Sequence, residues 1–180
     1  MKAISEMTVA ELGAFTATYL KENGVRVVLS GGACVTIYGD GQYVTGDIDF
    51  VVRGVRQLPR VSALLSELGF CQKRGRLFSH PETKILIGTN PEPLSVGAEP
   101  VLEIKTLKFS TGELDAISAT DCVKDRLAKF YHWNDYQSRV QAISVAKNST
   151  VDLQEVKRWS EKEGAVEKFE AFLRDLQKSN

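Results

Sequence analysis

Runs of apolar residues along the chain change between the spacing typical of helices and the spacing typical of strands. Near the start, Thr8 and Glu11 have the spacing of a capping box, which predicts a helix that begins near Val9. Apolar positions then recur at helical spacing until Gly24, a residue typical of helix ends. The β-branched run at 25–29 predicts a short buried strand directly after this helix.

A second strand is predicted after a tight turn and a short helix. Gly31 and Gly32 end the first strand, because two residues without Cβ atoms allow a sharp turn and a close approach by another group. Residues 47–52 alternate with the period of a strand. This alternation puts Asp47 and Asp49 on one face of the strand and apolar residues on the other.

The remaining patterns predict a mixed α/β core followed by a helical segment. Glycine, proline and the apolar spacing divide the middle of the chain into a helix at 58–68, short strands within 70–89, a loop at 90–100 and a strand at 101–109. The spacing beyond Ile117 is helical. We therefore expect an α/β (α+β) fold, with a mixed sheet flanked by helices over residues 1–117 and a C-terminal helical segment over 118–180 that packs back on this core.

The composition bears on three properties: nucleic-acid binding, the state of the cysteines and membrane association. The 180 residues carry 23 Lys and Arg against 23 Asp and Glu, so binding of nucleic acid would need a local basic patch. Three widely spaced cysteines (Cys34, Cys71 and Cys122) predict free thiols in a reducing, cytoplasmic setting, with Cys34 as a small buried residue rather than a nucleophile. No apolar run approaches the ~20 residues that span a membrane, so no membrane association is expected.

The turn and the acidic strand together suggest a phosphate and metal site. A helix that starts after Ser30-Gly31-Gly32 would present backbone N–H groups, which suit a phosphate. Asp47 and Asp49 would repel each other unless a cation such as Mg²⁺, shared with a nucleoside triphosphate, lies between them. A solvated face of an edge strand is the alternative explanation for the two acids.

Gly31-Gly32 followed by Asp47-Ile48-Asp49 resembles the signature of the nucleotidyltransferase superfold, the DNA polymerase β-like group. This group includes tRNA nucleotidyltransferases, minimal nucleotidyltransferases and toxins of the AbiEii type. The resemblance implies that Asp47 and Asp49 bind Mg²⁺ or Mn²⁺ and act in catalysis. It also implies that the Ser30-Gly31-Gly32 turn holds the nucleotide phosphates.

The chain departs from this pattern at the third carboxylate. Members of the superfold usually carry one on a strand after the helix that follows Asp-x-Asp. The strand expected to hold it, at 84–89, contains no acid, and the position falls near Gly88. Whether Glu92 or Glu103 lies within metal reach of the aspartates therefore distinguishes an active transferase from a binding module.

The helix predicted to run from Ser118 to about Trp133 contains a further candidate. Lys124 and Asp135 loosely resemble AbiEii-type segments in which a lysine contacts nucleotide phosphate and an aspartate acts near the acceptor hydroxyl. A surface helix with pairs such as Asp125–Lys129 explains the same residues equally well.

Two function hypotheses follow, and a third remains open. The first is a nucleotidyltransferase that binds a nucleoside triphosphate and Mg²⁺ and transfers a nucleoside monophosphate to a hydroxyl of an RNA, a protein or a small molecule. The second is a catalytically degenerate nucleotide-binding module, or one half of a toxin–antitoxin pair, whose protein partner binds the C-terminal helices. A plain α/β domain with an acidic strand face predicts no nucleotide affinity.

Overall fold

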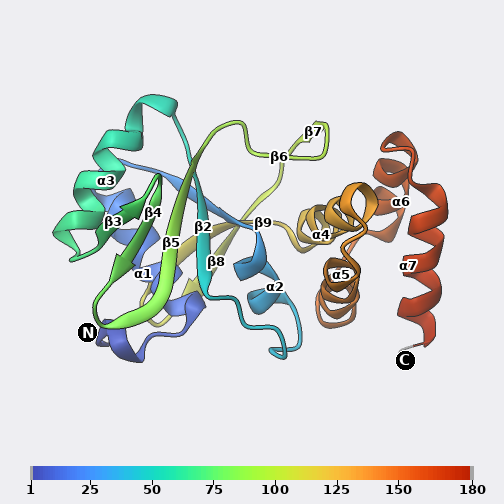
Figure 1. Cartoon of the computed structure of the whole chain (residues 1–180), viewed down its shortest axis with the longest axis horizontal. Coiled ribbons are helices and arrows are strands. Elements are labelled where there is room, and N and C mark those ends of the chain that lie inside the picture. Colours follow the sequence, from blue (N-terminus) through green and yellow to red (C-terminus); the bar gives the residue numbers. More distant parts are fainter. Residues whose placement is uncertain (1, 179–180) are drawn as a thin grey trace.

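The computed structural model describes residues 2–178 and contains a mixed sheet with helices around it (Figure 1). Seven strands hydrogen-bond in the order β3-β4-β5-β2-β1-β9-β8, and two further strands, β6 and β7, form a separate hairpin. The strands are β1 (Val27–Ser30), β2 (Asp47–Val52), β3 (Cys71–Arg74), β4 (Leu77–His80), β5 (Thr83–Pro91), β6 (Ser95–Val96), β7 (Glu99–Pro100), β8 (Ile104–Phe109) and β9 (Gly112–Ile117).

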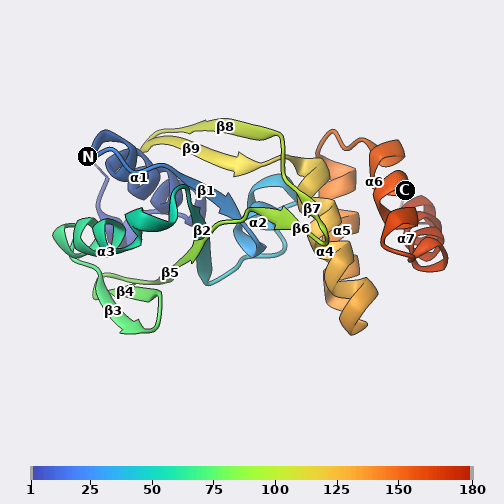
Figure 2. The same cartoon turned by 90° about the horizontal axis from the view of Figure 1, so that it is seen from above.

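The helices gather at two ends of the molecule. Figures 1 and 2 both show α1 and α3 beside one end of the sheet, while α4 to α7 lie at the other end, beyond α2. The helices are α1 (Val9–Glu22), α2 (Gly32–Tyr38), α3 (Leu58–Glu67), α4 (Ala119–Trp133), α5 (Tyr136–Asn148), α6 (Leu153–Lys162) and α7 (Val166–Lys178). Two short 3₁₀ helices occupy Ile4–Glu6 and Val55–Gln57.

The first helix begins as its sequence predicts. The Thr8 hydroxyl accepts a hydrogen bond from the Glu11 N–H, and the Glu11 carboxylate accepts one from the Thr8 N–H, which completes the capping box. α1 covers the face of β2 that carries Ile48 and Phe50, both fully buried. Each of these side chains contributes about 1.5–3 kcal/mol on burial. The aspartates of β2 therefore point to the opposite face.

The strand with the two aspartates is central in the sheet. β2 pairs antiparallel with β1, which puts Ser30 opposite Asp49. On its other side β2 pairs parallel with β5, which puts Asp49 opposite Gly88. An edge-strand explanation of the two acids is therefore wrong.

The predicted loop at 90–100 is wrong in part. β5 continues to Pro91, and the β6–β7 hairpin occupies part of the remainder. The Trp159 indole N–H donates to the Val96 carbonyl at 3.3 Å, so the hairpin is held by a contact with α6 that lies 63 residues away in the chain.

The change from strands to helices falls between Ile117 and Ala119. The division into a core over 1–117 and a helical segment over 118–180 stays a prediction as a domain boundary. Residues 1, 179 and 180 lie outside the described part of the chain. Within residues 2–178, none of the helices combines the length and apolar character needed to cross a bilayer.

Candidate functional site

The two aspartates lie at the start of β2, and no cationic side chain among residues 2–178 contacts either carboxylate. Asp47 is exposed and Asp49 is half-buried, and both point to the face of the sheet away from α1. In the described part of the chain, neither carboxylate forms an ion pair or a side-chain hydrogen bond. The site thus contains two adjacent negative charges that no lysine or arginine contacts directly in the part of the chain that the structure describes.

Asp49 fits between two glycines, Gly31 in the turn after β1 and Gly88 on β5. A Cβ atom added to Gly31 would lie 2.9 Å from Asp49 Oδ2, and one added to Gly88 would lie 2.7 Å from Oδ1. Gly31 also has φ of +73°, a conformation that glycine adopts without strain. Any side chain at either glycine would displace the carboxylate.

Burial and charge both act on this carboxylate. Burial raises the pKa of Asp49 above its ordinary value, and the neighbouring Asp47 carboxylate raises it further. Lys129 and Arg126, both on α4, oppose this effect and lower the pKa. The charged form of Asp49 is therefore costly as it stands, and a bound cation would stabilise it.

The turn before α2 brings hydroxyl groups close to the glycine backbone. A Cβ atom on Gly32 would lie 3.1 Å from Tyr43 Oη and 3.2 Å from Thr45 Oγ1. The Ser30 hydroxyl donates to the Asp49 carbonyl at 3.4 Å. Because α2 has only seven residues, its dipole contributes little to the site. The turn instead leaves space for a ligand beside the glycine backbone, and the nearby hydroxyl groups can donate hydrogen bonds.

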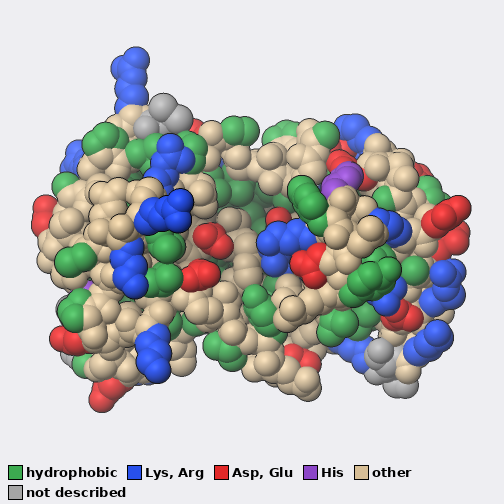
Figure 3. Space-filling view, viewed as in Figure 1, with side chains coloured by type: hydrophobic (Ala, Val, Ile, Leu, Met, Phe, Trp, Pro, Cys, Tyr) green, Lys and Arg blue, Asp and Glu red, His purple; other side chains and the backbone are tan. Residues whose placement is uncertain are grey.

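A helical wall faces the aspartates across a hollow. Figure 3 shows this hollow between the sheet and the α4–α5 helices, with acidic side chains on the sheet side and basic ones, with acids beside them, on the helical side. Lys129 is exposed and forms no ion pair within residues 2–178. Arg126 is buried; its Nε donates to Asp125 at 3.0 Å, and its Nη1 donates to Gln141 at 3.4 Å.

Lys124 lies elsewhere on the same helix. Its ammonium group is buried and donates to Asp121 at 3.2 Å and to Glu155 at 2.7 Å. At about 100° per residue, Lys124 is rotated by roughly 140–160° from Arg126 and Lys129 around α4. The sequence reasoning missed these two residues, although their i, i+3 spacing puts them on one helical face.

Asp135 caps a helix. Its carboxylate accepts hydrogen bonds from the N–H and hydroxyl of Ser138 at the start of α5, and these bonds lower the pKa of Asp135. The contacts give Asp135 a structural role at the N-cap.

The third carboxylate is missing from the strand where it was expected. Gly88, near which the third carboxylate was expected, lies directly opposite Asp49. Glu92 instead pairs with Arg53 at 3.1 Å and accepts the Gly54 N–H at 3.0 Å. Glu103 pairs with Lys105 at 2.5 Å, and residues 2–178 contain no group of three side chains suited to hold a metal.

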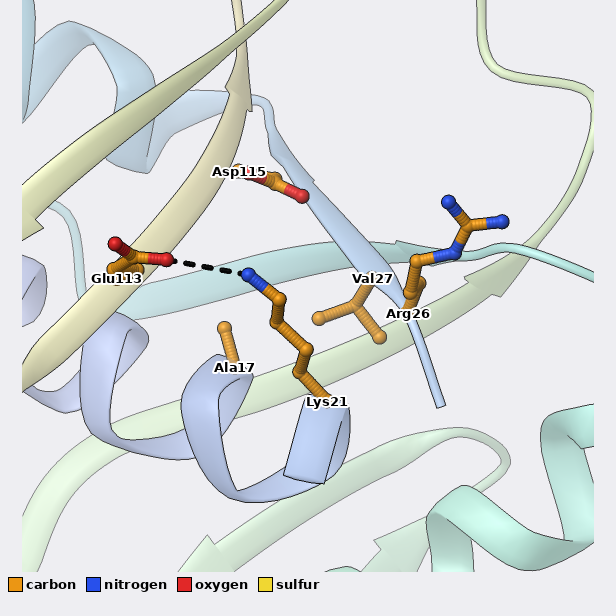
Figure 4. A pocket seen from close by; sticks show the side chains of 6 residues that line it. All are labelled: Ala17, Lys21, Arg26, Val27, Glu113 and Asp115. Atoms are coloured by element: carbon orange, nitrogen blue, oxygen red, sulfur yellow. Dashed lines mark hydrogen bonds and ion pairs between the residues drawn. The ribbon is translucent and has the colours of Figure 1, made fainter. Parts of the chain in front are cut away.

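Two other features are separate from this site. The pocket in Figure 4, between α1, β1 and β9, has a volume of about 10 Å³ and is crossed by the 3.2 Å ion pair of Lys21 with Glu113. Such a volume holds about one water molecule and excludes a nucleotide. Cys34 is fully buried, and burial with a hydrogen bond to Cys122 raises the pKa of its thiol, so it is a packing residue.

Known structures resemble this fold. The sequence matches no protein-family model and no curated protein. An antigenic nucleotidyltransferase-like protein from Paracoccidioides brasiliensis superposes with a TM-score of 0.57 and 13% identity, over 75% of each chain. The antibiotic-resistance factor ANT(2″)-Ia superposes in solution with a TM-score of 0.51 and 15% identity, over 95% of each chain. Its crystal structure with adenylyl-2″-tobramycin gives a TM-score of 0.52 and 14% identity, over 91% of this chain and 97% of that one.

The chain therefore has the nucleotidyltransferase fold, as the resemblance of its Gly31-Gly32 and Asp47-Ile48-Asp49 segments implied. The finer resemblance to AbiEii-type proteins stays a prediction.

Proposed function

We propose that the chain binds a nucleoside triphosphate together with Mg²⁺ or Mn²⁺, with the phosphates between the Ser30-Gly31-Gly32 turn and the Asp47/Asp49 pair. One observation carries this proposal: two adjacent carboxylates, unpaired within residues 2–178, lie beside a glycine turn and face an exposed lysine. The nucleotidyltransferase fold supports the same position for the nucleotide.

The donor set fits a cation that arrives with its nucleotide. Mg²⁺ is commonly held by one or two carboxylates together with substrate phosphates. Asp47 and Asp49 supply two carboxylates, and the raised pKa of Asp49 reflects a negative charge that a cation would stabilise. A bound cation would supply charge neutralisation at the transferring phosphate.

The proposed reaction is transfer of a nucleoside monophosphate to a hydroxyl. The acceptor oxygen bonds to the α-phosphorus while the bond from that phosphorus to the bridging oxygen of the β-phosphate breaks, the hydroxyl proton passes to solvent, and pyrophosphate leaves. Asp47 and Asp49 hold the cation, Gly31 and Gly32 let the phosphates approach the backbone, and Lys129 offsets negative charge from the opposite wall. Catalysis of this kind rests on positioning and electrostatics.

Lys129 takes the phosphate role that the resemblance gave to Lys124. The ammonium group of Lys124 already contacts two carboxylates, whereas Lys129 is exposed and acts electrostatically on Asp49. Arg126 contributes positive charge from a buried position, because its guanidinium donates hydrogen bonds to Asp125 and Gln141.

The structural neighbours suggest where to begin the search for an acceptor. One of them was solved with an adenylylated small molecule, adenylyl-2″-tobramycin. We therefore rank small-molecule hydroxyls first, ahead of RNA ends and protein side chains.

Pyrophosphate release tests the transfer step. Wild type and Asp49→Asn are incubated with each nucleoside triphosphate, Mg²⁺ and acceptors of the three classes. We expect acceptor-dependent release by wild type only, because asparagine keeps the shape of the aspartate side chain but lacks its charge. Equal release by the variant would contradict the assigned role of Asp49.

Gly88 favours a second candidate, a module that binds nucleotide without transferring it. A third carboxylate helps to hold the metal that activates an attacking hydroxyl in two-metal sites, and this chain has glycine opposite Asp49. Such a module would act as a nucleotide sensor or as one half of a toxin–antitoxin pair, with a protein partner on the C-terminal helices. Metal-dependent binding without pyrophosphate release for any acceptor would favour this candidate.

A further inference from the structure

One accessible stripe runs along α4, a helix that is otherwise buried on nearly every side. The half-buried Asp125 and the exposed Lys129, His132 and Trp133 form this stripe, and the remaining positions of the second half of the helix are buried. Asp125 and Lys129 both act electrostatically on Asp49, so the stripe begins at the proposed phosphate site. Its other end carries a large aromatic ring.

The geometry of the helix directs this ring toward the same hollow. At 3.6 residues per turn, Trp133 is rotated by about 20° from Arg126 and by about 40° from Lys129 around the axis of α4, and its direction falls between theirs. Both of those residues act on Asp49. Figure 2 shows α4 running away from β8 and β9, toward the side of the molecule on which β2 and β5 lie.

The distance along the helix suits the length of a nucleotide. Trp133 lies about 6 Å beyond Lys129 and about 10 Å beyond Arg126 along the axis of α4, at 1.5 Å per residue. In a nucleotide, a ribose separates the base from the phosphates by a similar length. A nucleotide whose phosphates lie near Lys129 can therefore bring its base to Trp133.

The indole of Trp133 is largely exposed. Trp133 is 73% exposed, whereas the chain's other tryptophan, Trp159, is fully buried. The Trp133 ring meets the His132 ring edge-on, at 78° and 5.8 Å. His132 itself pairs with Glu163 at 2.9 Å, on the side of α6 and α7. With 73% of Trp133 exposed, the indole keeps accessible flat surface for stacking.

We infer that Trp133 forms the stacking platform for the base of the bound nucleotide. The inference rests on the proposed function, and it adds the place where the base binds. Stacking on an aromatic ring tolerates every base, since each base has a flat π-face. Trp133 would thus contribute affinity with little preference among the four nucleotides.

Comparing two ligands, one with a base and one without, distinguishes the affinity contributed by the base from that contributed by the phosphates. Mg²⁺ with ATP and Mg²⁺ with inorganic tripolyphosphate are titrated calorimetrically into wild type, Trp133→Ala, Trp133→Phe and Tyr136→Ala. Tyr136 is a matched control, because it is an exposed ring (61%) that packs on Phe130 and under Arg139 instead of following the stripe.

We expect Trp133→Ala to weaken ATP binding about tenfold, as loss of one base–aromatic stack does, and to leave tripolyphosphate binding within about twofold of wild type. Trp133→Phe should retain most of the affinity for ATP, and Tyr136→Ala should match wild type for both ligands.

Two results would overturn the inference alone: ATP binding that Trp133→Ala leaves unchanged, or an equal loss for ATP and tripolyphosphate. Wild-type protein that binds neither ligand would overturn the proposed function and the inference with it.

Discussion

Two clusters of charged side chains on either side of α4 use the same residue types in opposite ways. In the first, here called the groove cluster (Asp47, Asp49 and Lys129), no charge is paired within the described residues. In the second, here called the α4–α6 cluster, each charge contacts an opposite one at 2.6–3.2 Å. Its members are Glu99, Asp121, Lys124, Glu155, Arg158 and Lys162.

The pKa shifts record this difference. Hydrogen bonds from Arg158 lower the pKa of Glu155 and of Glu99 to about 2, whereas burial raises the pKa of Asp49. Paired charges hold helices and a hairpin together, and unpaired ones cost stability that a ligand can recover. We therefore assign a stabilising role to the α4–α6 cluster and a ligand-binding role to the groove cluster.

The largest expected effect comes from breaking the α4–α6 cluster at its centre. Lys124→Ala removes a buried ammonium group and leaves the Asp121 and Glu155 carboxylates without it, so the free energy of unfolding should fall by about 3 kcal/mol. Denaturant unfolding measures this change. The exposed Lys162→Ala, which removes an ion pair to Glu99, is the control and should cost less than about 0.5 kcal/mol.

The same Lys124→Ala variant, studied while folded, should bind Mg²⁺ with ATP as wild type does. A folded variant that no longer binds nucleotide would return the phosphate role to Lys124, as the sequence resemblance implied.

Removing Lys129, the lysine of the groove cluster, should weaken nucleotide binding and leave stability almost unchanged. Lys129→Ala should weaken binding of Mg²⁺ with ATP about tenfold, because a charge-assisted contact to phosphate is lost. The free energy of unfolding should change by no more than about 0.5 kcal/mol, since the side chain is exposed and unpaired within the described residues. Calorimetry and denaturant unfolding measure the two quantities.

Lys157→Ala, which removes an exposed lysine from α6, is the matched control and should leave affinity unchanged. An equal loss of affinity in both variants would mean that net charge matters and the position of Lys129 does not.

A smaller loss of nucleotide affinity is expected when Gly88, the residue opposite Asp49, is replaced by alanine. The added Cβ of Gly88→Ala would lie 2.7 Å from Asp49 Oδ1, so the carboxylate must turn away at a cost of about 1 kcal/mol. Affinity for Mg²⁺ with ATP should fall about fivefold in calorimetry. Gly46→Ala adds the same atom where nothing lies within 4 Å and should have no effect. If both variants bind like wild type, the position of Asp49 is not critical.

The smallest effect concerns pH and the α4–α6 cluster. The folded pKa of Glu155 is about 2, below its ordinary 4.5, so its contribution to stability is complete above pH 4.5 and is lost as the pH falls toward 2. Glu155→Gln should therefore flatten the fall of unfolding free energy between about pH 4.5 and 2. At neutral pH the variant should lose less than about 1 kcal/mol, because the pair is partly exposed. Identical pH profiles for the variant and wild type would refute the assigned pairing.

Local patterns predicted the sheet side of the groove well. The Thr8 capping box, the glycine turn and the alternation at Asp47 and Asp49 depend on neighbours in the chain, and the expected loss of the third acid was found at Gly88. The nucleotidyltransferase fold was likewise predicted from these segments.

The helical wall was harder to predict, because its function depends on how α4 is rotated against the sheet. Lys124 and Lys129 are both lysines on one amphipathic helix, and only packing decides which of them is buried in ion pairs and which faces Asp49. The β6–β7 hairpin was missed for a related reason: its strands have two residues each and are held by Trp159 of α6.

Calorimetric titration of ATP, CTP, GTP and UTP, with Mg²⁺ or Mn²⁺, tests the central claim most directly. Wild type is compared with Asp47→Ala/Asp49→Ala, which should stay folded because neither carboxylate has a partner among the described residues. We predict metal-dependent binding by wild type and none by the double variant. Absence of nucleotide binding by well-folded wild type, or equal binding by both proteins, would contradict the account.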